Sequence, residues 1–136
     1  MVVVRIKSGL GNQLFHYATG RSLAHANNVR LKLDITSYST NPYRSYMLHF
    51  FNINADIATK EEIDQVLGDQ HEKSKVHKTV IKEKYYEFDP TVLGLHGTLY
   101  LDGHWQSEKY FKDIEQIVRK ELTLKTIPDT RNQVIA

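Results

Sequence analysis

The run Gly9-Leu10-Gly11-Asn12-Gln13 combines two glycines with two carboxamide side chains. Glycine allows a tight turn and leaves the neighbouring amides unshielded. If a helix follows, its first amides carry partial positive charge. The run is therefore a candidate binding site for a phosphate or a pyrophosphate. The simpler alternative, a short connection between a strand and a helix, stays open.

A dinucleotide site of the NAD type would need a third glycine and an acidic residue about 20 positions further on. Leu14 stands where the third glycine belongs, whereas Asp34 follows at about the required distance. The sequence thus keeps a Rossmann dinucleotide-binding module as an alternative, in which Asp34 would bind a ribose.

A second candidate site is Asp102-Gly103-His104-Trp105-Gln106, which contains the only tryptophan of the chain. An aromatic face beside directed hydrogen-bonding groups is how proteins hold a sugar ring. Asp102, His104 and Gln106 would supply those groups. The alternative is that Trp105 fills the core beneath the helix that follows.

Other residue types exclude several chemistries. Cysteine is absent, which excludes disulfide scaffolds, thiol nucleophiles and Cys-ligated metal sites. The seven histidines form no tight metal-binding pattern, and we expect no metal. His16 lies close to the glycine run, and a surface or packing role is expected for it rather than catalysis. Ser8 has no evident His and Asp support, so a serine hydrolase is not expected.

The elements that would position both sites indicate an α/β fold. Residues 2–7 and 29–34 are predicted strands around a helix over 12–26 with Asn12 as its N-cap, and this order implies a parallel βαβ unit. Thr59 and Glu62 indicate a capping box that opens a short helix. In the middle of the chain we expect an extended segment over 46–53, exposed polar residues over 69–75 and an irregular strand around 76–81. Further on, we expect a helical turn after Asp89-Pro90, a strand over 98–101 and an amphipathic helix over 110–122.

Composition and charge are those of a globular protein. The 136 residues have a mass of 15.8 kDa and suggest one domain with a core, since 40% are hydrophobic and 25% are charged. Lys and Arg number 18 against 16 Asp and Glu, so nothing indicates a nucleic-acid partner. No apolar run is long enough to span a bilayer, and no signal peptide is evident. We expect a cytoplasmic protein, with a peripheral position at the inner face of the membrane as the alternative.

Two blocks of sequence resemble a known family. Residues 3–18 read VVRIKSGLGNQLFHYA and residues 100–111 read YLDGHWQSEKYF. Together with Leu31-Lys32-Leu33-Asp34 and Phe88-Asp89-Pro90, they are similar to the α-1,2-fucosyltransferases of glycosyltransferase family 11. The resemblance runs from Met1 to about Leu124.

The resemblance implies a Rossmann-like N-terminal domain of a two-domain GT-B-like glycosyltransferase. It further implies an inverting transfer of L-fucose from GDP-fucose to the 2-hydroxyl of a terminal galactose, without a metal. The donor would then be faced by the glycine run, which consists of Gly9, Leu10, Gly11, Asn12 and Gln13. On the acceptor side, Trp105 and Gln106 would bind the galactose, and Asp102 or His104 would orient or deprotonate its hydroxyl. Asp102 is the preferred of the two, because the resemblance keeps it whereas His104 departs from the family pattern.

The chain also departs from the family pattern. Ser8 replaces a glycine, His16 a glutamine and His104 a tyrosine. Family members are about twice as long, and their His-x-Arg-x-Gly-Asp donor motif is missing here. We therefore expect residues 1–125 to form the acceptor-side domain, and 126–136 to form a linker and the start of a missing donor-binding domain. The chain alone should be inactive. A non-catalytic sugar-binding module remains a third alternative.

Overall fold

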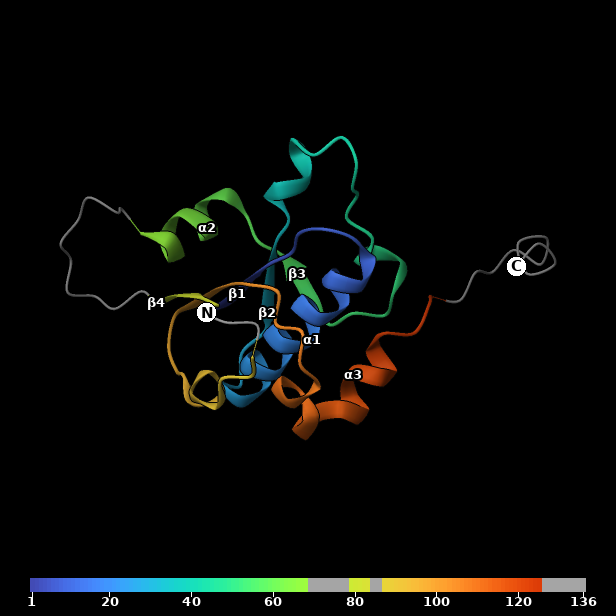
Figure 1. Ribbon diagram of the computed structural model, residues 1–136. Coiled ribbons are helices and arrows are strands. Elements are labelled where there is room, and N and C mark those ends of the chain that lie inside the picture. The colour runs from blue at the N-terminus through green and yellow to red at the C-terminus, as the bar shows by residue number, and fades with distance from the viewer. Residues whose placement is uncertain (69–78, 84–86, 126–136) are drawn as a thin grey trace.

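The computed structural model describes residues 1–68, 79–83 and 87–125. Its centre is a sheet of five parallel strands in the order β3-β2-β1-β5-β4, shown in Figure 1. Every neighbouring pair runs parallel. The strands are β1 (Val2–Arg5), β2 (Leu31–Asp34), β3 (Ala55–Ile57), β4 (Thr79–Lys82) and β5 (Leu99–Asp102). This arrangement confirms the predicted α/β, Rossmann-like fold.

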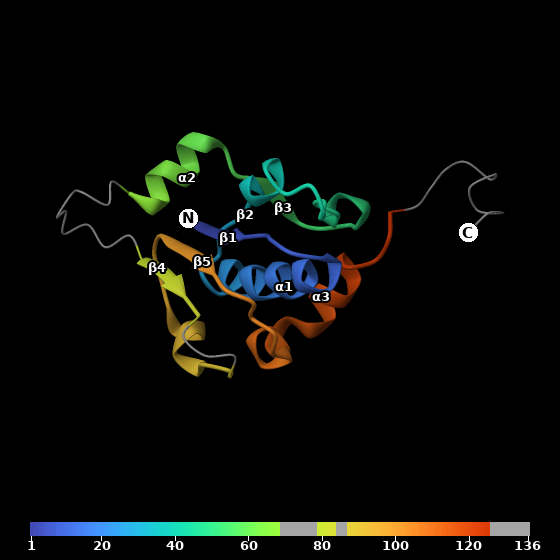
Figure 2. The same cartoon turned by 45° about the horizontal axis from the view of Figure 1, so that its top comes forward.

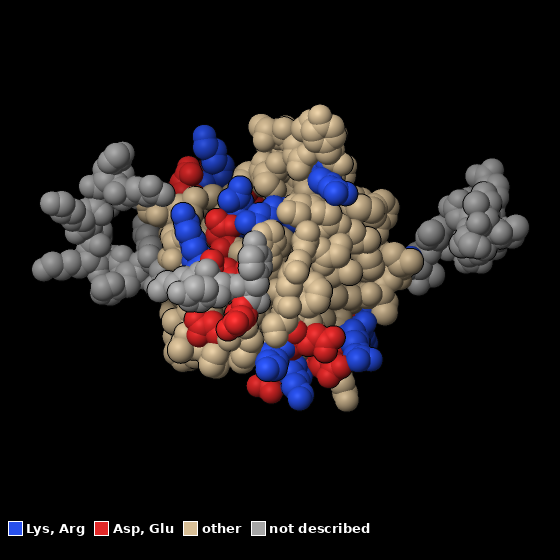
Figure 3. All heavy atoms as spheres, viewed as in Figure 1, with Lys and Arg blue, Asp and Glu red and all other residues tan. Residues whose placement is uncertain are grey.

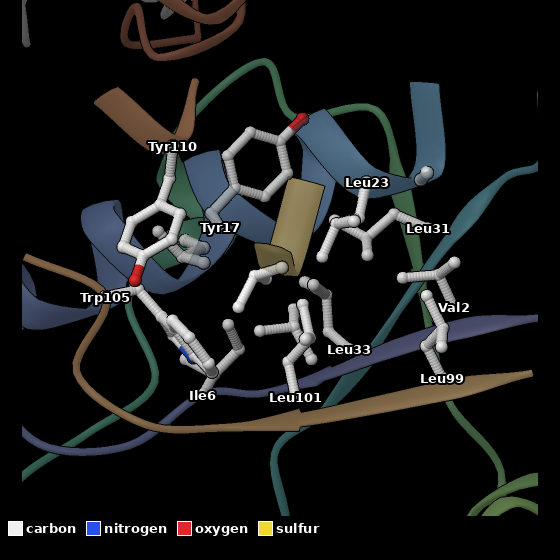
Figure 4. Packing of buried hydrophobic residues seen from close by; sticks show 14 residues of the cluster. Val2, Ile6, Tyr17, Leu23, Leu31, Leu33, Leu99, Leu101, Trp105 and Tyr110 are labelled. Atoms are coloured by element: carbon white, nitrogen blue, oxygen red, sulfur yellow. The ribbon is translucent and has the colours of Figure 1, made fainter. Parts of the chain in front are cut away.

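Helices cover both faces of the sheet. Helix α1 (Leu10–Ala26) and helix α3 (Glu115–Glu121) lie on one face, and α2 (Lys60–Leu67) lies on the other, as Figure 2 shows. Side chains alternate along a strand, so Val2, Val4 and Ile6 pack under α1 whereas Val3 packs with α2. Figure 4 shows the larger of these clusters, in which Leu31, Leu33, Leu99 and Leu101 meet Tyr17 and Leu23 of α1.

Helix α1 lies unusually close to the sheet and is also tied to α3. A Cβ atom on Gly20 would approach Cγ1 of Val4 to 2.7 Å, so only glycine fits at this crossing. On the outer side, Arg21 forms an ion pair with Glu121 at 3.1 Å. The hydroxyl of Tyr17 donates to the same carboxylate at 2.7 Å. These contacts fix α1, and with it the glycine turn at its start.

Several local predictions are confirmed and others are wrong. The capping box of Thr59 and Glu62 is present at the start of α2, and Asp89 caps a 3-10 helix over Pro90–Gly94. Residues 46–53 are not extended throughout, because a 3-10 helix forms over Leu48–Phe50. The predicted helix over 110–122 is α-helical only in α3, after 3-10 helices over Glu108–Tyr110 and Lys112–Ile114. Strand β3 was not predicted. The predictions for residues 69–76, 126–133 and the terminal Val134-Ile135-Ala136 lie outside the described residues.

The strand order creates a switch point beside β1. The chain passes from β1 to β2 and β3 on one side, and then crosses to β4 and β5 on the other. In open parallel sheets, ligands bind at the carboxyl ends of strands where the order reverses in this way. The residues that follow β1 and β5 are those of the two predicted sites.

Candidate functional site

The glycine turn opens α1. Gly9 is the N-cap residue, in extended conformation and without a side-chain cap, and the helix begins at Leu10. The prediction of Asn12 as N-cap is therefore wrong, and Asn12 lies in the first helical turn. The amide of Gln13 makes the first helical hydrogen bond, to Gly9 at 3.0 Å. The amides of residues 10–12 precede this bond and have no acceptor within the helix. A Cβ atom on Gly11 would meet nothing within 4 Å, so the turn is open there.

Gln13 holds the turn from inside rather than facing a ligand. Its side chain is fully buried. Nε2 donates to the carbonyls of Ser8 at 3.1 Å and Ser45 at 2.8 Å, and Oε1 accepts from the amide of Met47 at 2.9 Å. With both ends of its carboxamide used, Gln13 is a positioning residue. This corrects the predicted donor contact for Gln13, and it explains how the loop around residue 45 is drawn to the turn.

The same loop brings a cation that the sequence analysis did not identify. A Cβ atom on Gly9 would lie 3.6 Å from Nη1 of Arg44, so the guanidinium rests directly against the turn. Arg44 is exposed and forms no ion pair within the described part of the chain. An uncompensated guanidinium beside the amides of a helix N-terminus favours an anionic ligand.

Ser8 has a backbone conformation that favours glycine. Its φ is 68°, in the left-handed region that a side chain disfavours. The carbonyl of Ser8 accepts hydrogen bonds from Gln13 and, at 2.8 Å, from the hydroxyl of Tyr38. The backbone is thus held in a conformation that serine adopts only at a cost.

The second predicted site is a loop clamped by Glu83. The carboxylate of Glu83 accepts from the amides of His104 at 3.0 Å and Trp105 at 3.1 Å. A Cβ atom on Gly103 would approach Cβ of Glu83 to 2.6 Å, so the loop needs glycine there. Glu83 stands at the end of β4, next to the end of β5, and only the folded sheet brings it to this loop.

Trp105 is a core residue. It is 1% exposed, and its ring packs edge-on against Tyr110 with centroids 5.5 Å apart. Figure 4 shows the indole between Tyr110 and Ile6. So small an exposed fraction leaves almost no ring surface for a sugar, which argues against the predicted stacking role and supports the alternative of core packing. Its φ of 52° is a further constraint on the loop.

Asp102 lies at the end of β5 between two cations. Its Oδ1 accepts from Nζ of Lys7 at 3.0 Å, and its Oδ2 lies 3.3 Å from Nη1 of Arg5. Burial opposes ionisation of this carboxyl, but the two cations outweigh burial and hold the pKa of Asp102 below its usual value. A carboxylate of this kind is a poor proton acceptor.

His16 lies beneath the glycine turn, near His104. The imidazole of His16 is fully buried, and its Nδ1 accepts from the amide of Lys7 at 3.3 Å. Nε2 must then carry the proton of the neutral ring. Burial, followed by the charge of Lys7, lowers the pKa of His16 to about 4. The ring of His104 lies 6.2 Å away, centroid to centroid. The expected packing role of His16 agrees with this burial.

One contact brings the two predicted sites together. The side chain of Gln106 donates from Nε2 to Oδ1 of Asn12. Both residues remain accessible, unlike Gln13 and Trp105. Gln106 therefore adjoins the start of α1 across the carboxyl ends of β1 and β5, next to the predicted donor residues Gly9, Leu10, Gly11 and Asn12.

Asp34, on which the dinucleotide alternative rests, is not available to a ligand. It is 2% exposed. Its carboxylate accepts from the amide and hydroxyl of Thr36, at 2.9 and 2.7 Å, and from the hydroxyl of Tyr100. Because these internal donors occupy the carboxylate, the structure gives no support to a ribose contact at Asp34.

Comparison with known proteins found a glycosyltransferase. The chain is 29% identical over 133 residues to an alpha-1,2-colitosyltransferase of Escherichia coli, and the match covers 90% of this chain. The similarity supports a fucosyltransferase-like glycosyltransferase. The chain spans about half of that relative, since the match covers 45% of its length. No family model matches the chain, and no solved structure matches it.

The described residues contain neither a membrane-spanning helix nor a metal-binding cluster. None of their helices has the length and apolar character needed to cross a bilayer. No three of their His, Asp or Glu side chains gather in a way that could hold a metal ion.

Proposed function

We propose that this chain is the acceptor-side domain of an inverting glycosyltransferase that moves L-fucose from GDP-fucose to the 2-hydroxyl of a terminal galactose. The observation that carries the proposal is the contact of Gln106 with Asn12. It joins the glycine turn to the loop after β5 at the switch point of the sheet. A transferase needs its two substrates side by side at such a place.

The donor side of this site is cationic. The diphosphate of a nucleotide sugar is an anion, and the free amides of the first turn of α1 face it with partial positive charge. Arg44 adds a full charge at Gly9. As the glycosidic bond breaks, negative charge grows on the leaving diphosphate, so this cation contributes most in the transition state.

The transfer itself displaces a nucleotide from a sugar. The oxygen of the acceptor 2-hydroxyl attacks the anomeric carbon of fucose, the bond from that carbon to the diphosphate oxygen breaks, and GDP leaves with the electron pair. The hydroxyl proton passes to a base. We assign that role to His104, because the carboxylate of Asp102 is held by Lys7 and Arg5. Asp102 orients the end of β5 through these ion pairs.

The name of the relative suggests a second donor. That protein is a colitosyltransferase, so colitose rather than fucose is the alternative sugar for this site. Nothing in the turn distinguishes the two sugars, because Gly9, Gly11 and Arg44 would hold the diphosphate and not the sugar.

A transfer assay tests the proposal. The chain is combined with the part of the colitosyltransferase that it does not match, which we expect to bind the donor. The mixture is offered GDP-fucose or GDP-colitose with a β-galactoside. We expect transfer that depends on both parts. The chain alone spans about half of the relative and should be at least about 10²–10³-fold slower, because any charge stabilisation of the leaving group by the other part is then lost.

Two controls separate the alternatives. Calorimetric titration of the chain with NAD should show no binding. A chain that binds a galactoside but supports transfer from neither nucleotide sugar would be a sugar-binding module, and the proposed activity would then be wrong.

A further inference from the structure

A cavity of about 580 Å³ lies beside Gln106, between the loop after β5 and α3. Its volume is within the usual range for small-ligand sites of roughly 300–1,000 Å³. Gln106 and Ser107 form one wall, Phe111 and Val118 contribute apolar surface, and Lys112 and Glu115 add charged groups. All of these residues belong to the described part of the chain.

The cavity is connected to the first turn of α1 through Gln106. Gln106 lines it and also donates to Asn12, so one side chain touches both the cavity and the first turn of α1. The wall next to Gln106 is fixed by hydrogen bonds, because the amide of Ser107 donates to the carbonyl of Trp105 at 2.9 Å, and the Ser107 hydroxyl accepts from the amide of Lys109 at 3.3 Å. A ligand here would lie next to an anion held at the turn.

The chemistry of the lining fits a neutral polar ligand. Two carboxylates, Glu108 and Glu115, stand among three cations, Lys109, Lys112 and Arg119. Part of this charge is already paired, since Arg119 binds Glu115 at 2.6 Å. Figure 3 shows charges of both signs together over α3 and the turns before it. The lining therefore has an excess of one cation only. A phosphate would need several unpaired cations, and a lipid chain would need an apolar wall.

One aromatic ring lines the cavity. Phe111 is half-buried, and its ring packs against Phe15 with centroids 6.1 Å apart. This contact holds the ring in place, while part of it remains at the cavity wall. Phe111 therefore offers the accessible aromatic surface that the buried Trp105 does not.

We propose that this cavity binds the terminal neutral hexose of the acceptor, with Phe111 as its apolar contact and Gln106 and Lys112 as hydrogen-bond donors. The inference rests on the proposed function, which supplies the sugar acceptor. It names the place where that sugar lies, next to a donor held at Gly9–Asn12.

The test is a titration of the ¹⁵N-labelled chain with methyl β-D-galactopyranoside, followed by NMR. We expect shifts of the backbone amides of Ser107, Lys112 and Glu115 and of the side-chain amide of Gln106. Inorganic phosphate should leave these signals in place. Shifts confined to other residues, no shifts, or the same shifts with phosphate would each overturn the proposal.

Variants make the test specific. Phe111→Leu keeps an apolar side chain without the aromatic face, and should raise the Kd for the galactoside at least about fivefold. Phe50→Leu is the matched control, since Phe50 is 51% exposed and lies outside the cavity; its Kd should equal that of the unmodified chain. An unchanged Kd in a folded Phe111→Leu chain would overturn the proposal.

A second pair covers the case in which Phe111→Leu does not fold. Lys112→Ala should raise the Kd about threefold by removing a donor, whereas Lys120→Ala, an exposed lysine of α3 outside the cavity, should not. An equal Kd in both lysine variants counts against the proposal.

GDP-fucose added in a separate titration distinguishes this inference from the proposed function. GDP-fucose could shift the amide signals of Leu10 to Asn12, and transfer could occur, while the galactoside shifts no signal of the cavity residues. In that case only the location of the acceptor is wrong. If neither ligand produces a shift and no transfer is seen, the proposed function fails as well.

Discussion

The side chain of Gln106 donates a hydrogen bond to Asn12, and this contact joins the loop that follows β5 to the helix that follows β1. Asn12 belongs to the first turn of α1, and Gln106 lines the cavity beside α3. The two residues therefore form the border between the proposed donor and acceptor positions.

Asn12→Ala should lower kcat/KM in the reconstituted transferase about 100-fold, or about 2.7 kcal/mol of transition-state stabilisation. The substitution removes a directed polar group at the donor turn and also the hydrogen bond with Gln106, and both contribute to the loss. A double-mutant cycle with Gln106→Ala measures the second part, and we expect effects that are not additive. Additive effects and normal kinetics in Asn12→Ala would leave the turn with a purely structural role.

Arg44→Gln should weaken binding of GDP to the chain about tenfold, because a charge-assisted hydrogen bond to the diphosphate is lost. The affinity should also become less dependent on salt. Isothermal titration calorimetry measures both effects. Arg30→Gln is the matched control, since Arg30 is an exposed arginine that pairs with Asp56 at the other end of β2. Equal losses in the two variants would contradict a role for Arg44.

Trp105→Ala should lower the free energy of unfolding by about 3–5 kcal/mol, because it leaves a cavity between Tyr110 and Ile6. Trp105→Phe should cost much less, since Nε1 of the indole is buried without a hydrogen-bond partner in the described part of the chain. Urea unfolding of both variants provides the measurement. A Trp105→Ala chain of normal stability that no longer binds a galactoside would restore the stacking role.

The stability of the chain should fall as the pH is lowered from 6.5 to about 4. In this window the unfolded chain protonates His16, whereas the folded chain keeps it neutral, so the unfolded state binds more protons. With about 1.4 kcal/mol for each pH unit, the loss from this group is about 3 kcal/mol. Asp102 contributes in a lower range, because its folded pKa is depressed from 3.8.

The control for this pH dependence is His16→Gln, which keeps a polar side chain but removes the titrating group. Its urea midpoint should vary much less between pH 6.5 and 4 than that of the unmodified chain. Equal pH dependence in the two proteins would show that another group causes the loss.

Ser8→Gly should stabilise the fold by about 1 kcal/mol, because glycine adopts a φ of 68° without strain. Ser45→Gly is the comparison, since Ser45 does not have a positive φ and glycine there adds only flexibility to the unfolded chain. Thermal unfolding of both variants measures the difference. A less stable Ser8→Gly chain would contradict the strain at this turn.

The sequence predicts the elements that depend on local patterns. The β-branched run of β1, the capping box of Thr59 and the glycine turn all carry short-range signals, and all form as expected. Strand β3 has three residues and no run of β-branched side chains, so only its pairing with β2 defines it. The helix predicted over 110–122 breaks at Phe111, whose φ of −129° is not helical, because Tyr110 packs against Trp105 and Phe111 against Phe15.

The sequence also predicts only part of the candidate site. Local motifs identify four residues that lie together, which are Gly9, Gly11, Asn12 and Gln106. Arg44 and Glu83 reach the two loops only through tertiary structure, so no spacing rule identifies them. The burial of Gln13 and Trp105 likewise depends on what surrounds them, because a glutamine or tryptophan in a loop has the same sequence pattern whether it faces inward or outward.

The position of β1 has a consequence for synthesis of the chain. This strand leaves the ribosome before the other four strands of the sheet, yet it becomes the central one. One edge of β1 pairs with β2 early, but the other edge must wait for β5, which places Leu99 beside Val2. Until then a valine-rich strand edge stays open to wrong partners. Folding should therefore be slow, as expected for pairings between distant segments, and nascent chains that stall before residue 99 should need a chaperone to stay unaggregated.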